Sequence, residues 1–271
     1  MIGDRSRPRA IILAAGRGSR LDAYTKDRPK CLAELGGQTL IGRQIATLGG
    51  AGIKDIVIAT GYRGEMLNLP GTRQILNPHW ETTNMVESLF CTAAEFGRDL
   101  IVSYSDIVYE PRVLAALLNS PEEISIVVDR NWRTYWEHRF EDPLSDAESL
   151  RMDARGCITD VGNKVTDIDE IEAQYIGLMR FRNGGIDALR AARAGLGAVP
   201  RPWMEKRPLT GAYMTDLLME VILSGVAVHA VPVAGGWLEI DTAKDYEKAV
   251  AMMADGSITR FFDSDAETVN G

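Results

Sequence analysis

The segment formed by residues 10–30 constrains the fold and chemistry of this chain more than any other. Residues 10–13 are an apolar run with the length and composition of a buried strand, and they lead into a turn at residues 14–20 that holds two glycines and two arginines. Glycine lets backbone amides approach a ligand closely, and successive amides in a turn form a nest that binds anions. Lys30 adds a further positive charge ten residues after the turn. A strand followed by amides and cations predicts a site for the phosphates of a nucleotide.

Two common phosphate-binding motifs do not match this turn. The P-loop pattern, with a lysine directly after its second glycine, is absent from the chain. The dinucleotide fingerprint needs a third glycine, and Leu21 stands in its place. The longer string, Leu-Ala-Ala-Gly-x-Gly-x-Arg followed by Pro29 and Lys30, resembles the signature of nucleotidyltransferases. That family joins a nucleoside triphosphate to a phosphorylated small molecule.

The resemblance assigns roles to the turn and to the lysine. In the family the loop wraps the triphosphate and the lysine contacts phosphate. The resemblance implies that Arg17, with the loop amides, holds the β- and γ-phosphates, and that Lys30 stabilises charge at the α-phosphate and on the departing pyrophosphate. Arg17 and Lys30 are therefore candidate catalytic residues. The candidate nucleotide-binding residues of this segment are Leu13, Ala14, Ala15, Gly16, Gly18, Arg20 and Lys30.

Strand-like and helix-like segments alternate through the first half of the chain. Such alternation predicts a mostly parallel, Rossmann-like α/β sheet with helices on both faces, in which ligands bind at the carboxyl ends of strands. The expected strands are residues 10–13, 55–59, 72–76, 100–102 and 124–128. The expected helices are residues 39–50, 84–95 and 111–119.

The alternation breaks at about residues 130–180. Short strands at residues 150–153, 157–161 and 174–181 suggest a small inserted lid of antiparallel strands over the acceptor side. Later segments at residues 186–194, 213–223 and 243–254 read as helices, and those at 227–231 and 237–241 read as strands. We expect a single nucleotidyltransferase domain over residues 8–255, with this insertion, and a polar tail at 256–271.

Composition excludes several kinds of partner. The 271 residues carry a net charge of −8, which argues against nucleic acid or an anionic membrane as the main partner. The three cysteines lie far apart and lack metal-binding spacing, so reduced thiols are expected. No apolar run approaches membrane-spanning length, and the N-terminus lacks the apolar core of a signal peptide. We expect a cytoplasmic protein and leave open whether it forms a homo-oligomer.

Two aspartates are candidate ligands for Mg²⁺. Asp106 follows an apolar strand of the expected sheet, and Asp241 follows another strand and precedes a helix. Mg²⁺ is usually bound by one or two carboxylates together with phosphates. By local sequence alone, Asp106 could equally cap a turn, and Asp241 is a good helix N-cap. The family resemblance favours metal binding by both and implies Glu239 as a weaker third ligand.

Further segments are expected to recognise the nucleotide. Residues 60–62 follow the second strand, and Asn84 opens a helix, where it could serve simply as the N-cap. The spacing of Asn77, Asn84 and Ser88 is similar to a stretch of phosphocholine cytidylyltransferase-like enzymes, which use CTP, with the serine shifted by one position. The further candidate nucleotide-binding residues are Thr60, Gly61, Tyr62, Asn84, Ser88 and Ser105.

The acceptor side depends on a lysine and several aromatic residues. Lys164 could be a solvated turn residue, but in similar enzymes a lysine at this place neutralises the acceptor's phosphate, which makes it a third candidate catalytic residue. Aromatic faces can bind a quaternary ammonium group, although ordinary packing also explains these side chains. The candidate acceptor-binding residues are Trp136, Lys164, Tyr175, Tyr213 and Asp216.

The resemblance implies transfer of CMP from CTP to a phosphorylated, amine-bearing acceptor with release of pyrophosphate. The acceptor's phosphate is already ionised at neutral pH, so no general base is required. One alternative is a sugar-1-phosphate nucleotidyltransferase that uses dTTP, UTP or GTP. Another is a nucleotide-binding regulatory module without catalysis.

Overall fold

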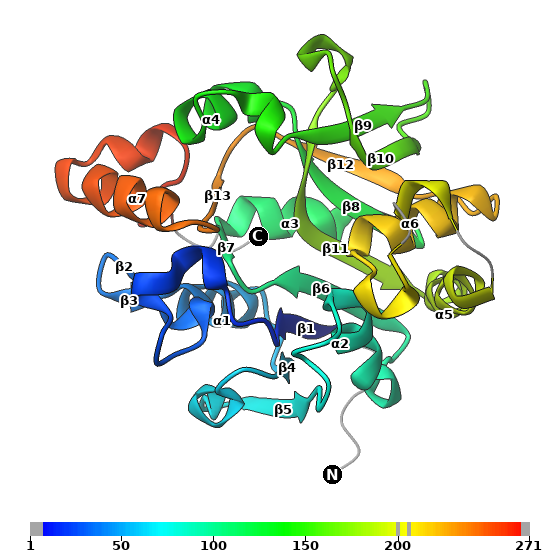
Figure 1. Ribbon diagram of the computed structural model, residues 1–271, viewed down its shortest axis with the longest axis horizontal. Helices are drawn as coiled ribbons and strands as arrows, with labels where there is room; N and C mark the ends of the chain where they lie inside the picture. Colours follow the sequence, from blue (N-terminus) through cyan, green and yellow to red (C-terminus); the bar gives the residue numbers. More distant parts are fainter. Residues whose placement is uncertain (1–7, 199–200, 205–206, 267–271) are drawn as a thin grey trace.

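A seven-stranded sheet runs through the centre of the computed structural model, which describes residues 8–198, 201–204 and 207–266 (Figure 1). One strand, β11, is antiparallel to both of its neighbours, and every other neighbouring pair in the sheet is parallel. The strands lie in the order β12 (His229–Val233), β8 (Ile124–Asp129), β11 (Gln174–Arg182), β6 (Asp99–Tyr104), β1 (Arg9–Ala14), β4 (Asp55–Thr60) and β5 (Thr72–Leu76). The predicted, mostly parallel α/β sheet is confirmed.

The register of the central strands brings three loops to one edge of the sheet. Leu13 pairs with Tyr104, and Ala14 pairs with Thr60. Strands β1, β4 and β6 run in the same direction, so the segments that follow them leave the sheet side by side. Ligands of such sheets bind at this edge, because the loops there are free to vary while the strands hold them in place.

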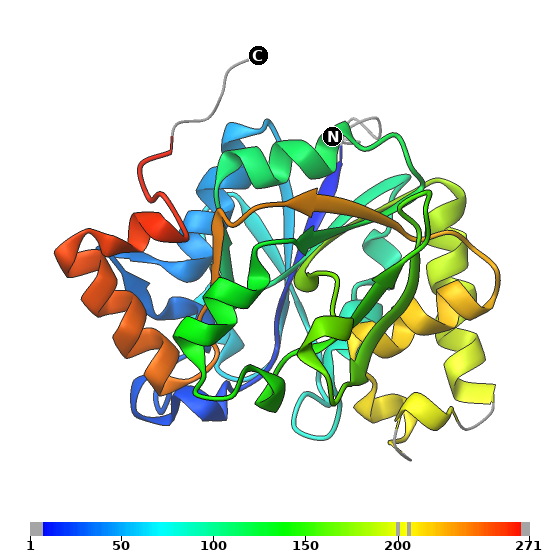
Figure 2. The same cartoon turned by 90° about the horizontal axis from the view of Figure 1, so that it is seen from above.

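Helices cover both faces of the sheet, since alternate strand residues point to opposite sides. Ala10 and Ile12 belong to one buried cluster, and Ile11 and Leu13 belong to the other. Figures 1 and 2 show the two helix layers on either side of the strands. The first cluster is built with α1 (Leu40–Gly50), α3 (Pro111–Asn119), α4 (Trp132–Arg139) and α7 (Ala243–Asp255). The second is built with α2 (Met85–Cys91), α5 (Gly184–Ala198) and α6 (Met214–Leu223).

Three two-stranded antiparallel ribbons complete the fold of the described residues. The predicted hairpin at residues 150–161 is present and is slightly longer than expected. The ribbons pair β2 (Glu34–Leu35) with β3 (Gln38–Thr39), β7 (Ile107–Tyr109) with β13 (Trp237–Glu239), and β9 (Glu148–Met152) with β10 (Ile158–Lys164). No helix of the described residues is long and apolar enough to cross a membrane.

The expected lid at residues 130–180 is wrong in two places. Strand β11 lies inside the central sheet between β6 and β8, because most of its residues are buried and need cover on both sides. Residues 132–139 form helix α4, whose aromatic side chains Trp132, Tyr135 and Trp136 are 3%, 5% and 3% exposed. Only the β9–β10 hairpin therefore fits the idea of an added antiparallel element.

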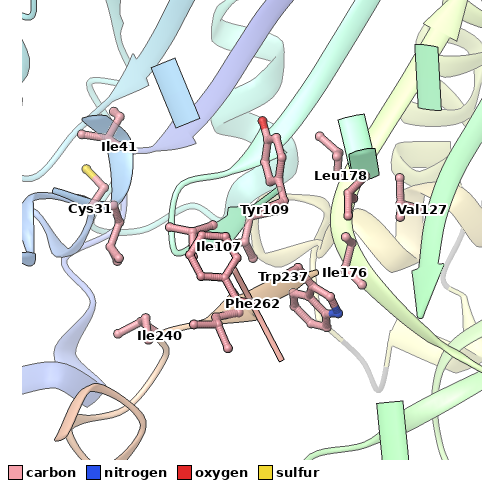
Figure 3. Close-up of a cluster of buried hydrophobic side chains, with 14 of the residues drawn as sticks. Cys31, Ile41, Ile107, Tyr109, Val127, Ile176, Leu178, Trp237, Ile240 and Phe262 are labelled. Carbon is pink, nitrogen blue, oxygen red and sulfur yellow. The ribbon is translucent and has the colours of Figure 1, made fainter. Parts of the chain in front are cut away.

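The start of the expected polar tail also belongs to the core. A short 3₁₀ turn, Ser257–Arg260, leads to Phe261 and Phe262, which are 8% and 4% exposed. Figure 3 shows Phe262 among the side chains of the first buried cluster, beside residues of β7 and β13. Burial of these two apolar rings helps to hold this segment against the domain, and residues 267–271 lie outside the described part of the chain.

Candidate active site

The turn after β1 packs directly against the stem of Lys30. Gly18 has φ +70°, and a Cβ at this position would lie 2.7 Å from the Lys30 Cβ. Both facts require glycine there. The Thr25 hydroxyl donates to the Gly18 carbonyl at 3.1 Å, which holds the turn closed. Gly16, by contrast, has open space around its Cα, so the backbone there is accessible to a ligand.

Lys30 joins the two candidate metal ligands. Its Nζ lies 2.6 Å from Asp106 Oδ2 and 2.8 Å from Asp241 Oδ1. These residues come from a 3₁₀ turn, the loop after β6 and the loop after β13, so the fold brings together positions that are far apart in sequence. Burial alone would lower the pKa of Lys30, but the two carboxylates outweigh it and the pKa is raised. The lysine is a permanent cation at neutral pH.

Asp106 and Asp241 retain capacity for a further ligand. Among the described residues, Asp106 Oδ1 is buried without a hydrogen-bond partner. Arg20 Nη1 lies 2.5 Å from Asp241 Oδ2, and its side chain is 67% exposed, so it can move. A buried carboxylate oxygen without a donor is costly unless water or a cation binds to it. Carboxylate oxygens of this kind fit a hard divalent cation.

A cavity of about 270 Å³ lies between the turn after β1 and helix α2. It takes in most of the nucleotide-binding candidates, including Asn84, Ser88 and Ser105. The residues that line it are Leu13, Ala14, Ala15, Gly16, Gly18, Ser19, Arg20, Pro29, Lys30, Cys31, Trp80, Thr83, Asn84, Met85, Ser88, Tyr104, Ser105, Asp106 and Asp241. The two side chains expected near the base, Asn84 and Ser88, already have protein partners. Asn84 Oδ1 accepts from the Met85 amide at 2.8 Å, and the Ser88 hydroxyl is 3.0 Å from Asn77 Nδ2.

The segment after β4 supports this cavity rather than lining it. Thr60 is buried, and the Tyr62 hydroxyl donates to the Lys26 carbonyl at 2.5 Å. A Cβ on Gly61 would lie 2.4 Å from the Ala15 carbonyl oxygen, so glycine lets the loops after β1 and β4 touch. Arg17 is also outside the lining, with its guanidinium carbon 5.7 Å from the Tyr62 ring centre. Trp80 and Thr83 line the cavity instead, and sequence reasoning missed both.

A second and larger cavity, of about 630 Å³, adjoins the first. The two share Arg20, Met85, Tyr104, Asp106 and Asp241. The Lys30–Asp106–Asp241 cluster therefore lies where the two cavities meet. The remaining residues that line the second cavity are Trp136, Asp146, Glu148, Gly162, Asn163, Lys164, Gln174, Tyr175, Pro202, Trp203, Arg207, Tyr213, Thr215 and Glu239.

Four of the five acceptor-binding candidates line this second cavity: Trp136, Lys164, Tyr175 and Tyr213. Asp216 does not. Its carboxylate lies 3.0 Å from Arg207 Nη2 and accepts from the Tyr213 amide at 2.7 Å. This aspartate therefore closes the N-terminus of α6 and pairs with an arginine, which leaves it turned away from a ligand.

Arg139 on α4 organises the segment that carries Asp241, and no local sequence pattern marks it. This arginine is 3% exposed, and its Nη1 lies 2.5 Å from Glu239 Oε2. Its Nε lies 3.1 Å from Asp245 Oδ1, and Asp245 Oδ2 accepts from the Thr242 amide at 2.9 Å. Burial and nearby acids raise the pKa of Glu239 to about 7 although Arg139 opposes the shift. Glu239 thus faces the second cavity but already has a cationic partner.

Glu148 is a second residue that sequence reasoning missed. It begins β9, and its side chain is open to the second cavity. Desolvation by the surrounding protein atoms and repulsion by Asp146, Glu239 and Asp216 raise the pKa of its carboxyl to about 7, and Arg207 opposes the shift. When folding raises the pKa of an acid, the acid is more protonated in the folded state than in the unfolded state at every pH between the unfolded and the folded pKa.

This raised pKa gives a testable pH dependence. Between about pH 4.5, the ordinary pKa, and about pH 7, ionisation of Glu148 makes the folded state progressively less stable than it is at low pH. Glu148→Gln removes this loss, so we expect the variant to gain stability relative to the unmodified protein as pH rises from 5 to 8. Urea unfolding of both proteins at the two pH values measures the difference. An equal difference at pH 5 and pH 8 would contradict the raised pKa.

Comparison with known proteins identifies the family. Residues 10–163 match the MobA-like NTP transferase domain, which is more than half of the chain. A CTP:phosphoglutamine cytidylyltransferase of Campylobacter jejuni subsp. jejuni serotype O:2 is 39% identical over 250 residues, covering 88% of this chain and 97% of that protein.

Two solved structures share the fold. The CTP:phosphocholine cytidylyltransferase from Streptococcus pneumoniae superposes with a TM-score of 0.68 at 20% identity, covering 91% of this chain and 99% of that one. The inositol-1-phosphate CTP transferase from T. maritima gives 0.68 at 21% identity, covering 92% and 97%. The chain belongs to the MobA-like NTP transferase family and is a nucleotidyltransferase.

Proposed function

We propose that this protein transfers CMP from CTP to the phosphate of a small molecule and releases pyrophosphate. The observation that carries the proposal is the meeting of two cavities at Lys30, Asp106 and Asp241. One cavity suits a nucleotide and the other an acceptor, so the reacting phosphates would meet at this cluster. The Campylobacter relative, a CTP:phosphoglutamine cytidylyltransferase by name, supports CTP as the donor and a phosphorylated acceptor.

The reaction needs positioning and charge neutralisation rather than a base. An ionised phosphate oxygen of the acceptor attacks the α-phosphorus of CTP, a new phosphorus–oxygen bond forms, and pyrophosphate leaves with the electrons of the broken bond. Within the described chain, no histidine lines either cavity. Lys30, held at the junction, neutralises charge that develops on the α-phosphate, and such preorganised cations are effective in phosphoryl chemistry.

We assign Mg²⁺ to Asp106 and Asp241. The buried Asp106 Oδ1, which has no donor among the described residues, fits a cation ligand, and both carboxylates bond to Lys30 Nζ. When bound, Mg²⁺ would add positive charge at the α-phosphate. Glu239 is the weaker candidate because Arg139 already holds its carboxylate.

The remaining cations would bind the outer phosphates and the acceptor. Arg20 lines both cavities and is released from Asp241 at little cost because it is largely exposed. Arg17 lies on the exposed side of the turn and would have to swing toward the β- and γ-phosphates. Lys164 lines the second cavity, where it would hold the acceptor's phosphate.

Pyrophosphate release tests the proposal directly. The full chain is mixed with Mg²⁺, with CTP, dTTP, UTP or GTP in turn, and with phosphoglutamine, phosphocholine, phosphoethanolamine or a sugar 1-phosphate. We expect release with CTP and a phosphorylated acceptor, and none when EDTA removes the metal. Pyrophosphate release only with a sugar 1-phosphate and another triphosphate would indicate a sugar-1-phosphate nucleotidyltransferase instead. Binding of CTP without release in any mixture would favour a regulatory module.

A further inference from the structure

Glu148 differs from the other acids near the second cavity because its carboxylate has no partner among the described residues. Asp146 Oδ2 accepts from Trp136 Nε1 at 3.1 Å. Glu239 is held by Arg139, and Asp216 is held by Arg207. Glu148, in contrast, makes no side-chain hydrogen bond or ion pair with the described residues, although its backbone groups bond to the Gln174 side chain and it pairs with Lys164 in the β9–β10 ribbon. Away from the Lys30 cluster, its carboxylate is the one among these acids that is open to a group of the acceptor.

The charges around Glu148 favour a cationic ligand. Asp146, Glu239 and Asp216 raise the pKa of its carboxyl by repelling its negative charge, and Arg207, which is itself paired with Asp216, opposes them. A positive group placed against Glu148 would offset that repulsion. Positive charge for a phosphate comes from Lys164, which lies opposite Glu148 in the β9–β10 ribbon, and from Arg20 at the junction with the first cavity. The cavity therefore offers both a place for an anion and a place for a cation.

The aromatic side chains of the cavity are not arranged as an open cage. Three of their rings already have a guanidinium nearby: Trp136 has Arg139 at 5.1 Å, Trp203 has Arg201 at 5.7 Å, and Tyr213 has Arg207 at 4.6 Å. The other two rings, Tyr104 and Tyr175, meet edge to face with their centres 5.8 Å apart. A quaternary ammonium group, which cannot donate hydrogen bonds, needs free aromatic faces. A primary ammonium group can instead donate to a carboxylate.

We propose that Glu148 selects acceptors that carry a primary ammonium group, so that the acceptor is a phosphorylated primary amine rather than a phosphorylated quaternary amine or a neutral phosphate ester. This inference rests on the proposed function, because it assigns the second cavity to the acceptor. It makes Glu148 a specificity-determining residue that hydrogen-bonds the ammonium group and takes no part in bond breaking.

The test compares acceptors that differ at one nitrogen. Phosphoethanolamine and phosphoglutamine are each paired with the N-acetylated form, and phosphocholine supplies the quaternary case. With CTP and Mg²⁺, we expect the free amines to have at least tenfold lower KM than their acetylated forms. In Glu148→Gln this preference should shrink about tenfold while kcat and the KM for CTP stay within twofold. Glu141→Gln, a change at a 96% exposed side chain outside both cavities, is the matched control.

The outcomes separate this inference from the proposed function. Turnover with CTP that favours phosphocholine or the acetylated probes, or an unchanged preference in Glu148→Gln, would overturn the role of Glu148 and leave cytidylyl transfer standing. If no probe is turned over, calorimetric titration of the same probes onto the full chain with CTP and Mg²⁺ gives the preference without turnover. Loss of the free-amine preference in the variant would then support the inference. Equal binding of the free and acetylated forms to the unmodified protein would refute it.

Discussion

Replacing Lys30 with alanine is expected to lower kcat by about two to three orders of magnitude, the loss typical of removing one preorganised group that stabilises transition-state charge. The lysine is placed at the junction of the two cavities by Asp106 and Asp241, at 2.6 and 2.8 Å from its Nζ. Among the described residues, no other lysine lines the first cavity, and Arg20, which does line it, already pairs with the other oxygen of Asp241. Steady-state pyrophosphate release under saturating CTP and acceptor measures the effect.

Two controls distinguish lost catalysis from lost structure. Without the lysine, Asp106 loses its cationic partner and Asp241 keeps only the exposed Arg20, which can cost stability. Thermal unfolding of the variant should therefore be followed with and without Mg²⁺, which could occupy the vacant cationic position. Lys30→Arg keeps the charge and the fold but alters its geometry, so activity should remain well below that of the unmodified protein. Lys54→Ala, at an exposed position before β4, should have no effect. A folded Lys30→Ala protein with near-normal kcat would refute the role of the lysine.

The centre of this site could be predicted because its parts are encoded locally. The turn after β1 is recognisable from residues 14–20, and Asp106 follows an apolar strand. The parallel strands then bring these two parts together, because pairing of Leu13 with Tyr104 places the loops after β1 and β6 at the same edge of the sheet. A local motif together with a general rule about parallel strands is enough to bring Lys30 and Asp106 within reach of each other.

The acceptor side could not be predicted in the same way because it depends on distant partners. In the sequence, nothing distinguishes Arg139 from the other charged residues of its helix, because its partners Glu239 and Asp245 lie 100 and 106 positions away. Strand β11 has the apolar pattern of any buried strand, and nothing local says whether it joins a hairpin or enters the central sheet. Glu148 becomes distinctive only when the neighbouring carboxylates are seen to have partners and its own carboxylate is seen to have none among the described residues.

Replacing Asp106 with asparagine is expected to lower kcat by at least two orders of magnitude and to raise the Mg²⁺ concentration for half-maximal activity by at least tenfold. Asparagine keeps the shape of the side chain, and its carbonyl can still accept from Lys30, so the fold should survive. What is lost is a negative charge and a ligand oxygen, and hard cations depend on both. Mg²⁺ titrations of pyrophosphate release, run beside thermal unfolding, measure the two effects separately.

The metal response is what separates a ligand from a residue that only holds Lys30. If Asp106 acted solely by positioning the lysine, Asp106→Asn would lower kcat at every Mg²⁺ concentration without shifting the midpoint. A shifted midpoint requires a changed affinity for the ion. Asp241→Asn should shift it in the same direction, and the double variant should lose less than the sum of the two, because both carboxylates would bind one ion. Asp169→Asn, at a 76% exposed side chain outside both cavities, should leave the titration unchanged. An unaltered midpoint in Asp106→Asn would therefore show that Asp106 does not bind the metal and that it acts only by holding Lys30.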